Sequence, residues 1–241
     1  YSKQMGINKK IIIVASPAVQ ENFKIQLFDE RKLKNINGFW NIKACTGNAF
    51  IKEVNPMTMK GLSFDKIVKQ IKKIISHSYI FMGYIEFANY IKKVMLRNIH
   101  PEQTSEYKRE KKIKNVKKEF SNRLLIIDEI QNIRSIESDP KLKKTSQFFY
   151  QIVKYTDSLK LLLLSATPMF NSHKEIIWIL NLMNLNDNRS AINESDVFDT
   201  HDNLIVSENG EEIGKNILIQ KSTGYISFVP GENPFRFPFK I

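Results

Sequence analysis

The sequence predicts an α/β protein built on a parallel β-sheet with helices on its faces. Short, wholly apolar runs recur along the chain, and each ends abruptly at polar residues. Between them lie longer stretches with the three-to-four-residue spacing of amphipathic helices. Strands that alternate with helices indicate βαβ units, whose strands are parallel. Two runs are the most informative, because residues 124–127 are followed by Asp128 and Glu129, and residues 161–164 by Ser165.

The first half of the chain alternates between β-branched runs and helical patterns. Pro17 suits the first turn of a helix with Ser16 as its N-cap, and Ser63 precedes an isoleucine stripe at helical spacing. In order, we expect a strand over residues 11–15, a helix from Pro17, a weaker strand over 42–46, a helix after Ser63, a strand over 79–83, and a helix carrying Phe87, Tyr90, Ile91 and Val94.

The second half begins with a strongly charged segment and ends without clear periodicity. We expect a basic surface helix within 101–122, the strand at 124–127, a polar loop at 135–140, a helix around 148–153, the strand at 161–164 and a helix over 175–185. The apolar pattern then decays into Asn, Asp and Glu. We therefore place a first domain at residues 1–190 and a linker or small lobe at 191–241.

Asp128 and Glu129 are the candidate chemical groups. The apolar run before them is too short for a buried helix and lacks the alternation of a half-exposed strand, so we expect a central parallel strand buried on both faces. Open α/β sheets bind ligands at the carboxyl edge, where these acids would lie. Two adjacent carboxylates there suit a magnesium–nucleotide site. The alternative is that the acids merely cap a neighbouring helix.

Composition limits the partners. The 241 residues carry a formal net charge of +12, which favours a polyanionic partner; the alternative is a lysine-rich solvated surface. A single cysteine excludes an intramolecular disulfide, and we expect an intracellular protein. No apolar stretch approaches the roughly 18–20 residues that cross a bilayer, so no membrane partner is expected.

Several segments together resemble a known family. Asp128-Glu-Ile-Gln131 followed by Ser165-Ala-Thr167-Pro168 resembles motifs II and III of superfamily-two helicases and translocases. Residues 12–23 look like their motif Ia, and Gly83-Tyr84 is similar to the motif Ib region. The resemblance is to the DEAH-like, Swi/Snf-type branch, above all to the nucleoside triphosphatases and early transcription factor helicases of large cytoplasmic DNA viruses. The segment 224–238 is similar to the one that joins their two motor lobes.

The resemblance implies a fold and a set of residue roles. The fold would be a RecA-like sheet flanked by helices, here a partial first motor lobe. Asp128 would hold Mg²⁺ and Glu129 would be the catalytic base. Gln131 would belong with the two acids to the catalytic residues and would sense the nucleotide state by hydrogen bonding toward Ser165 and Thr167, which would be the coupling residues. The nucleic-acid backbone would pass Ser16, Pro17, Gly83 and Tyr84.

Three of these assignments keep a plainer alternative. Ser16 is a suitable helix cap in any protein. Ser165 and Thr167 could form a hydroxyl-rich turn before Pro168. Tyr84 could serve packing.

The implied function is an ATP-dependent helicase or nucleoside triphosphatase, viral and associated with transcription. ATP and Mg²⁺ would be its cofactors, and nucleic acid its partner, with DNA favoured over RNA and the transcription machinery as a further partner. The location would be the virion or the host cytoplasm. The alternatives are a non-catalytic nucleic-acid-binding or assembly module derived from a helicase lobe, and a different α/β nucleotide hydrolase.

One departure from the family is clear. The phosphate loop Gly-x-x-x-x-Gly-Lys-Ser/Thr is absent, since Lys9 and Lys10 follow a single glycine and precede no Ser or Thr. We expect that loop before Tyr1 and the second lobe with its arginine finger beyond Ile241, so that the chain is a piece of a longer enzyme. The 241 residues alone are then predicted to lack ATPase activity.

Overall fold

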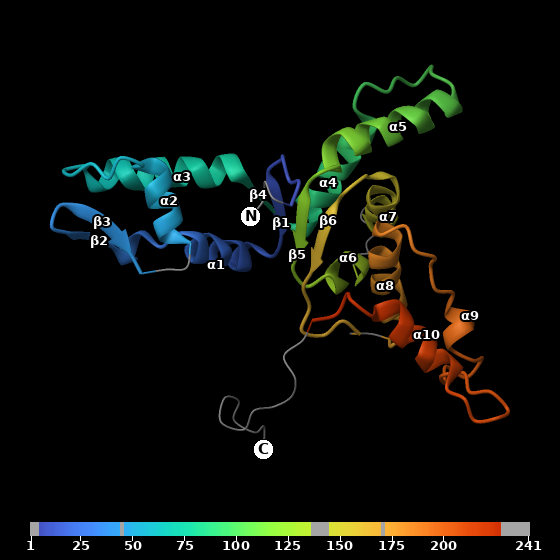
Figure 1. Cartoon of the computed structure of the whole chain (residues 1–241). Coiled ribbons are helices and arrows are strands. Elements are labelled where there is room, and N and C mark those ends of the chain that lie inside the picture. The colour runs from blue at the N-terminus through green and yellow to red at the C-terminus, as the bar shows by residue number, and fades with distance from the viewer. Residues whose placement is uncertain (1–4, 44–45, 136–144, 170–171, 228–241) are drawn as a thin grey trace. The chain divides into compact units, whose positions relative to one another are not determined.

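The computed structural model describes residues 5–43, 46–135, 145–169 and 172–227 (Figure 1). The chain divides into two compact units, Tyr1–Glu175 and Ile176–Ile241. Of the polar loop expected at 135–140, Ser135 instead ends a short helix, and residues 136–140 lie outside the described residues, as do residues 228–238 of the tail segment.

The first unit is organised by a parallel sheet, which confirms the predicted α/β class. Within the described residues the sheet has four strands, in the order β4 (Tyr79–Met82), β1 (Ile11–Val14), β5 (Leu124–Ile127) and β6 (Lys160–Leu163). All three neighbouring pairs are parallel. This arrangement is consistent with part of a RecA-like domain.

Burial differs between the strands. The strand β5 is central, as expected, but only Leu125 and Ile127 are fully buried, while the alternate residues are partly exposed. Its second face is therefore less covered than we predicted. The strand β6 forms an edge of the described sheet, and Leu162 is 45% exposed.

Helices α4 (Tyr84–Leu96), α5 (Ser105–Phe120) and α7 (Thr145–Tyr155) pack on one another beside the sheet (Figure 1). Aromatic pairs join them: Phe87 meets Phe149 edge-on with ring centroids 6.2 Å apart, and Tyr90 meets Phe120 at 6.0 Å. The helix expected within 101–122 is thus confirmed as α5, which uses Val116 and Phe120 for packing.

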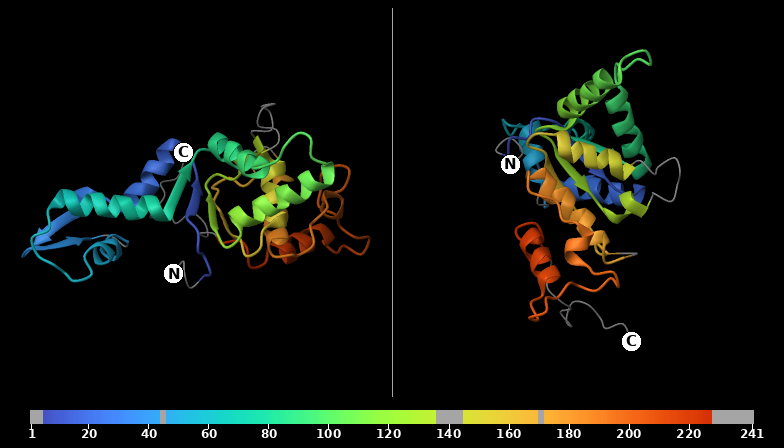
Figure 2. Two further views of the ribbon diagram at one scale, coloured as in Figure 1. Left: turned by 90° about the horizontal axis from the view of Figure 1, so that it is seen from above. Right: turned by 90° about the vertical axis from the view of Figure 1, so that its right-hand side faces the viewer.

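Residues between β1 and β4 form a separate layer, seen at the far left of Figure 2. It comprises α1 (Pro17–Leu27), a short 3₁₀ turn η1 (Glu30–Lys32), the antiparallel strands β2 (Leu33–Ile36) and β3 (Phe39–Ile42), α2 (Gly47–Val54) and α3 (Phe64–Ser78). Its core contains Phe28, Leu33, Ile42, Ile51, Ile67, Val68 and Ile71.

The expected strand at 42–46 is wrong. Ile42 ends β3, Thr46 is already the N-cap of α2, and residues 44–45 lie outside the described part. The hairpin turns at Asn37 and Gly38, whose φ angles of 52° and 85° suit a type I′ turn.

The predicted helix caps have mixed outcomes. The Ser63 side chain accepts a hydrogen bond from the Lys66 amide at 3.4 Å, which confirms the cap of α3. Ser16 occupies the N-cap position of α1, but its side chain makes no capping hydrogen bond.

The elements of the second unit in its described residues are helices joined by loops, with one isolated antiparallel bridge between Phe198 and Leu204. The helix α8 (Glu175–Asn186) begins at the boundary, and α9 (Glu194–Val197) and α10 (Ile213–Ser222) follow. Ile177, Leu180, Ile192, Val197 and Phe198 form its core. Asn181 fixes the turn after α8, because its amide donates to the Ile192 carbonyl at 2.9 Å and accepts from the Ile192 amide at 2.7 Å.

Candidate functional site

The carboxyl ends of β5 and β6 lie side by side and carry the candidate residues. Main-chain hydrogen bonds continue past the strands: the Asp128 amide donates to the Val14 carbonyl at 2.9 Å, and the Leu164 amide donates to the Ile127 carbonyl at 2.8 Å. The Ile130 amide then donates to the Leu164 carbonyl at 3.2 Å. These bonds hold the residues after β5 against those after β6.

A chain of side-chain hydrogen bonds crosses between the two strand ends. The Gln131 amide nitrogen donates to the Glu129 carboxylate at 2.5 Å and to the Thr167 hydroxyl at 3.3 Å. The Ser165 hydroxyl donates to the Gln131 amide oxygen at 2.8 Å and accepts from the Thr167 main-chain amide at 3.0 Å. The hydrogen bonds expected of Gln131 toward Ser165 and Thr167 are therefore present, and the same amide also holds Glu129.

Glu129 has an unusual backbone. Its φ is +46°, in the left-handed region that side-chain-bearing residues seldom adopt. Such a conformation costs on the order of 1–3 kcal/mol and persists where neighbouring structure holds it. Here the Asp128 and Ile130 amides, on either side of Glu129, are bonded to β1 and to the residue after β6. The turn directs the chain from β5 into α6 (Gln131–Ser135).

The electrostatics of Asp128 follow from its surroundings. Partial burial, together with the adjacent negative charge of Glu129, raises the pKa of the Asp128 carboxyl, and a backbone hydrogen bond opposes this only in part. Among the described residues, no Lys, Arg or His forms an ion pair with Asp128 or Glu129. Two half-buried carboxylates thus stand together without a cationic partner in that part of the chain.

This donor set fits one kind of metal. Mg²⁺ commonly binds one or two carboxylates and completes its shell with water and substrate phosphates. The described residues hold no group of three or more His, Cys, Asp or Glu that could form an all-protein metal site. A magnesium ion carried with a nucleotide is therefore compatible with the acids present, with Asp128 as the protein ligand.

Tyr84 connects β4 to this edge. Its hydroxyl donates to the main-chain oxygen of Asp128 at 2.9 Å and accepts from the Asn132 side-chain amide at 3.3 Å. Burial raises the pKa of the Tyr84 phenol, and the negative charges of Asp128 and Glu129 act in the same direction, so the phenol stays protonated and can donate. Sequence reasoning missed Asn132, although its place three residues after Glu129, directly beside Gln131, was a usable signal.

The other residues expected to contact nucleic acid lie at the same edge of the sheet. Ser16 and Pro17 follow β1, and Gly83 follows β4; the Ala15 amide donates to the Met82 carbonyl at 3.0 Å, which keeps the two strand ends together. Pro17 is exposed, and Ser16 and Gly83 are partly exposed. All nine predicted site residues therefore follow strands of one sheet at its carboxyl edge, and their roles stay predictions.

Comparison with known proteins finds similarity to a viral protein named as a helicase. The chain is 25% identical over 229 residues to a protein of Acanthamoeba polyphaga mimivirus named "Putative ATP-dependent RNA helicase L377", an alignment that covers 86% of this chain and 18% of the relative. The chain thus spans about a fifth of that protein's length. No family model and no solved structure matches the chain. The similarity is to a helicase-like protein and does not distinguish a branch.

None of the helices in the described residues is both long enough and apolar enough to span a bilayer.

Proposed function

We propose that this chain is part of the first motor lobe of an ATP-dependent nucleic-acid helicase or translocase of superfamily two, in the branch of the viral nucleoside triphosphatases. The complete protein would couple Mg-ATP hydrolysis to movement on DNA or RNA. The observation that carries the proposal is the hydrogen-bonded chain from Glu129 through Gln131 to Ser165 and Thr167. It links an acid at one strand end to hydroxyl groups at the next.

The residues would divide the work as follows. Asp128 would hold the metal ion, which when bound neutralises charge on the nucleotide phosphates. Glu129 would accept a proton from the attacking water, and Gln131 would fix the position of its carboxylate. Because the Gln131 amide also contacts Thr167 and accepts from Ser165, a change at the Glu129 carboxylate would alter the contacts of the strand end after β6.

The nucleic-acid track would run past Ser16, Pro17, Gly83 and Tyr84. Tyr84 supports this placement because its hydroxyl already contacts the main chain of Asp128, which would bring the track close to the nucleotide. The net charge of +12 favours a polyanion. We extend the proposal to a viral protein that serves transcription inside the host cell or virion, on the basis of the sequence resemblance and the mimivirus relative.

The test is the ATPase activity of the chain joined to its flanking segments, measured without nucleic acid and with single- or double-stranded DNA or RNA. We expect nucleic-acid-stimulated turnover that Glu129→Gln reduces by about 10³-fold or more, since it removes the proton acceptor. Glu53→Gln, at an exposed position of α2, is the matched control and should leave turnover unchanged. Nucleic-acid binding without any ATPase would instead favour the non-catalytic module.

A further inference from the structure

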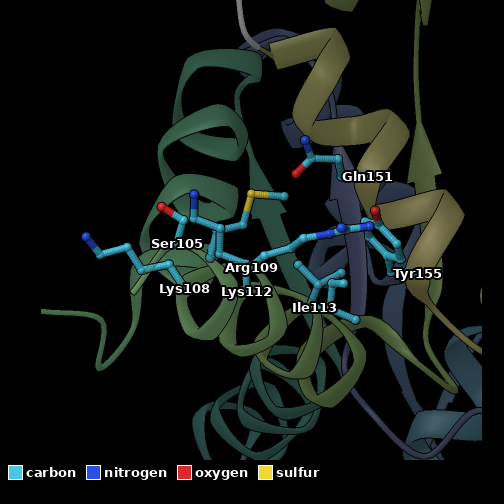
Figure 3. Close-up of a pocket in the computed structure, with 9 residues that line it drawn as sticks. Ser105, Lys108, Arg109, Lys112, Ile113, Gln151 and Tyr155 are labelled. Atoms are coloured by element: carbon cyan, nitrogen blue, oxygen red, sulfur yellow. The ribbon is translucent and has the colours of Figure 1, made fainter. Parts of the chain in front are cut away.

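A second candidate site lies on the first unit, away from the strand-end acids. It is a cavity of about 400 Å³ between α4, α5 and α7 (Figure 3). Met95 near the end of α4 and Tyr155 at the end of α7 both line it. Because α4 leaves the carboxyl end of β4 and α7 leads into the start of β6, these positions lie toward the amino edge of the sheet, opposite Asp128 and Ser165.

The cavity is basic. Lys108, Arg109 and Lys112 of α5 line it, and no acidic residue does. Lys108 donates to the Pro101 carbonyl at 2.6 Å, a neutral partner that leaves its charge uncompensated. Within the described residues Arg109 and Lys112 form no ion pair, whereas Lys117 on the same helix pairs with Asp157. Cations that gather around a hollow without a carboxylate partner are typical of a site for an anion.

The remaining lining adds apolar and hydrogen-bonding groups. Ile113 and Val116 of α5 and Met95 of α4 supply apolar lining, and Gln151 and Tyr155 line the cavity from α7. Figure 3 shows the Arg109 side chain extending across the cavity toward the Tyr155 ring. A basic groove combined with an aromatic ring is the arrangement with which proteins hold single-stranded nucleic acid, the cations contacting phosphate and the ring contacting a base.

We propose that this cavity binds a nucleoside phosphate, namely one nucleotide of a single strand whose backbone follows the basic face of α5. Lys108 and Lys112 are one helical turn apart, about 6 Å along the axis, so they can contact neighbouring phosphates while Arg109 reaches into the cavity. A concave site of this volume admits a single nucleotide rather than a duplex. The identity of the ligand rests on the proposed function; the location of the site does not.

The test compares two double variants that remove equal charge from the same helix. Arg109→Gln with Lys112→Gln changes the cavity, and Lys114→Gln with Lys118→Gln changes exposed positions outside it. Binding of the 241-residue chain to labelled oligothymidylate and oligouridylate is measured by fluorescence anisotropy across a salt series. The single variant Arg109→Gln is included, because an exposed arginine can be replaced without disturbing the core, and melting curves verify folding.

We expect the cavity variant to weaken oligonucleotide binding roughly tenfold. It should also reduce the magnitude of the slope of log affinity against log salt by about 1.4, because the phosphate contact of Lys112 and that of Arg109 with the phosphate inside the cavity are both lost. In the control variant, the oligonucleotide affinity and the salt slope should both change far less. Binding of adenosine monophosphate is measured in the same way. If the cavity variant weakened this binding tenfold but left oligonucleotide binding unchanged, the cavity would bind a free nucleotide and not a single strand. The proposal would be overturned if oligonucleotide affinity fell equally in both double variants or in neither of them. It would also be overturned if the cavity variant lost more affinity for polyglutamate, tested as a polyanion without bases, than for the oligonucleotides.

These outcomes separate the inference from the proposed function. Oligonucleotide binding that depends on Ser16 and Tyr84 but not on Arg109 and Lys112 would remove the second site and leave the motor intact. Conversely, oligonucleotide binding could depend on Arg109 and Lys112, and persist in a chain with Glu129→Gln, while the chain joined to its flanking segments shows no ATPase activity. That result would support the second site and contradict the proposed motor function.

Discussion

Asp128 illustrates how a candidate functional side chain can lower stability. Burial and the charge of Glu129 raise the pKa of its carboxyl in the folded chain. A carboxyl with a raised folded-state pKa binds its proton more tightly when folded. The bound proton therefore stabilises the folded chain at low pH. This stabilisation is lost as the pH rises through the pKa that the Asp128 carboxyl has in the folded chain. At neutral pH the ionised Asp128 destabilises the fold.

We therefore expect Asp128→Asn to raise the melting temperature at pH 7. The difference from the unsubstituted chain should shrink as the pH falls below the ordinary aspartate pKa, about 3.9, where both side chains are neutral. Thermal melts followed by circular dichroism over a pH series give the measurement. An equal or lower melting temperature at pH 7, or a difference that does not vary with pH, would contradict this account.

Gln131 is the residue on which the hydrogen-bond chain depends, because it contacts both strand ends. Gln131→Leu removes these contacts while keeping a similar volume, so we expect a loss of about 1 kcal/mol in the free energy of unfolding. If the chain is joined to flanking segments that give ATPase activity, as proposed, the stimulation of that activity by nucleic acid should fall more than the basal rate.

Urea denaturation and ATPase assays with and without nucleic acid measure the two effects of Gln131→Leu. Gln70→Leu, at an exposed position of α3, is the control and should stay within about 0.5 kcal/mol. If basal and stimulated rates fell by the same factor, Gln131 would not act as a coupling residue.

The site residues could be predicted from sequence because they follow strands directly. An apolar run that ends in Asp128 or in Ser165 fixes both the strand and the edge at which the polar residue emerges. The left-handed turn at Glu129 and the contact of Asn132 with Tyr84 could not be predicted in this way. Both depend on how β5 meets its neighbours.

At the scale of elements, the starts of α1 and α3 look alike in sequence and differ in structure. Ser63 bonds the first turn of α3, whereas Ser16 makes no such bond to α1. We expect Ser63→Ala to cost about 1 kcal/mol of unfolding free energy and Ser16→Ala less than about 0.5 kcal/mol. Urea denaturation of the two variants compares them directly.

If Ser16 serves the nucleic-acid track, Ser16→Ala should instead weaken oligonucleotide binding without loss of stability. If Ser16→Ala lowered the free energy of unfolding as much as Ser63→Ala does, Ser16 would act as a helix cap in solution.

The layer between β1 and β4 was the part of the fold least accessible to sequence reasoning. Its hairpin carries a recognisable signal, Asn37-Gly38 between the four-residue segments 33–36 and 39–42, each of which contains apolar residues. The strand expected at 42–46 failed because Ile42 belongs to the hairpin and Gly47 already lies in α2. Short apolar runs without a clear period do not define their own boundaries; here packing against α3 does.

At the scale of the whole molecule, the 241 residues contain the candidate catalytic acids and the proposed coupling residues but no Gly-x-x-x-x-Gly-Lys-Ser/Thr sequence. We expect the chain alone to release little or no phosphate from ATP, because neither a phosphate loop nor an arginine finger would stabilise the charge of the transition state. In other nucleotide hydrolases an arginine finger alone raises the rate by about 10³–10⁵-fold. Phosphate release by the purified chain is the measurement. Robust turnover that Glu129→Gln abolishes would contradict the expectation.

At Glu129, the residue that would best suit the backbone differs from the residue that the proposed catalysis requires. Its left-handed φ would be relieved by Gly, Asn or Asp, each of which has a shorter side chain that cannot carry a carboxylate as far toward Gln131. Selection for heat resistance alone should therefore enrich Gly, Asn or Asp at this position and remove glutamate. Selection for turnover should restore glutamate and accept a more fragile protein.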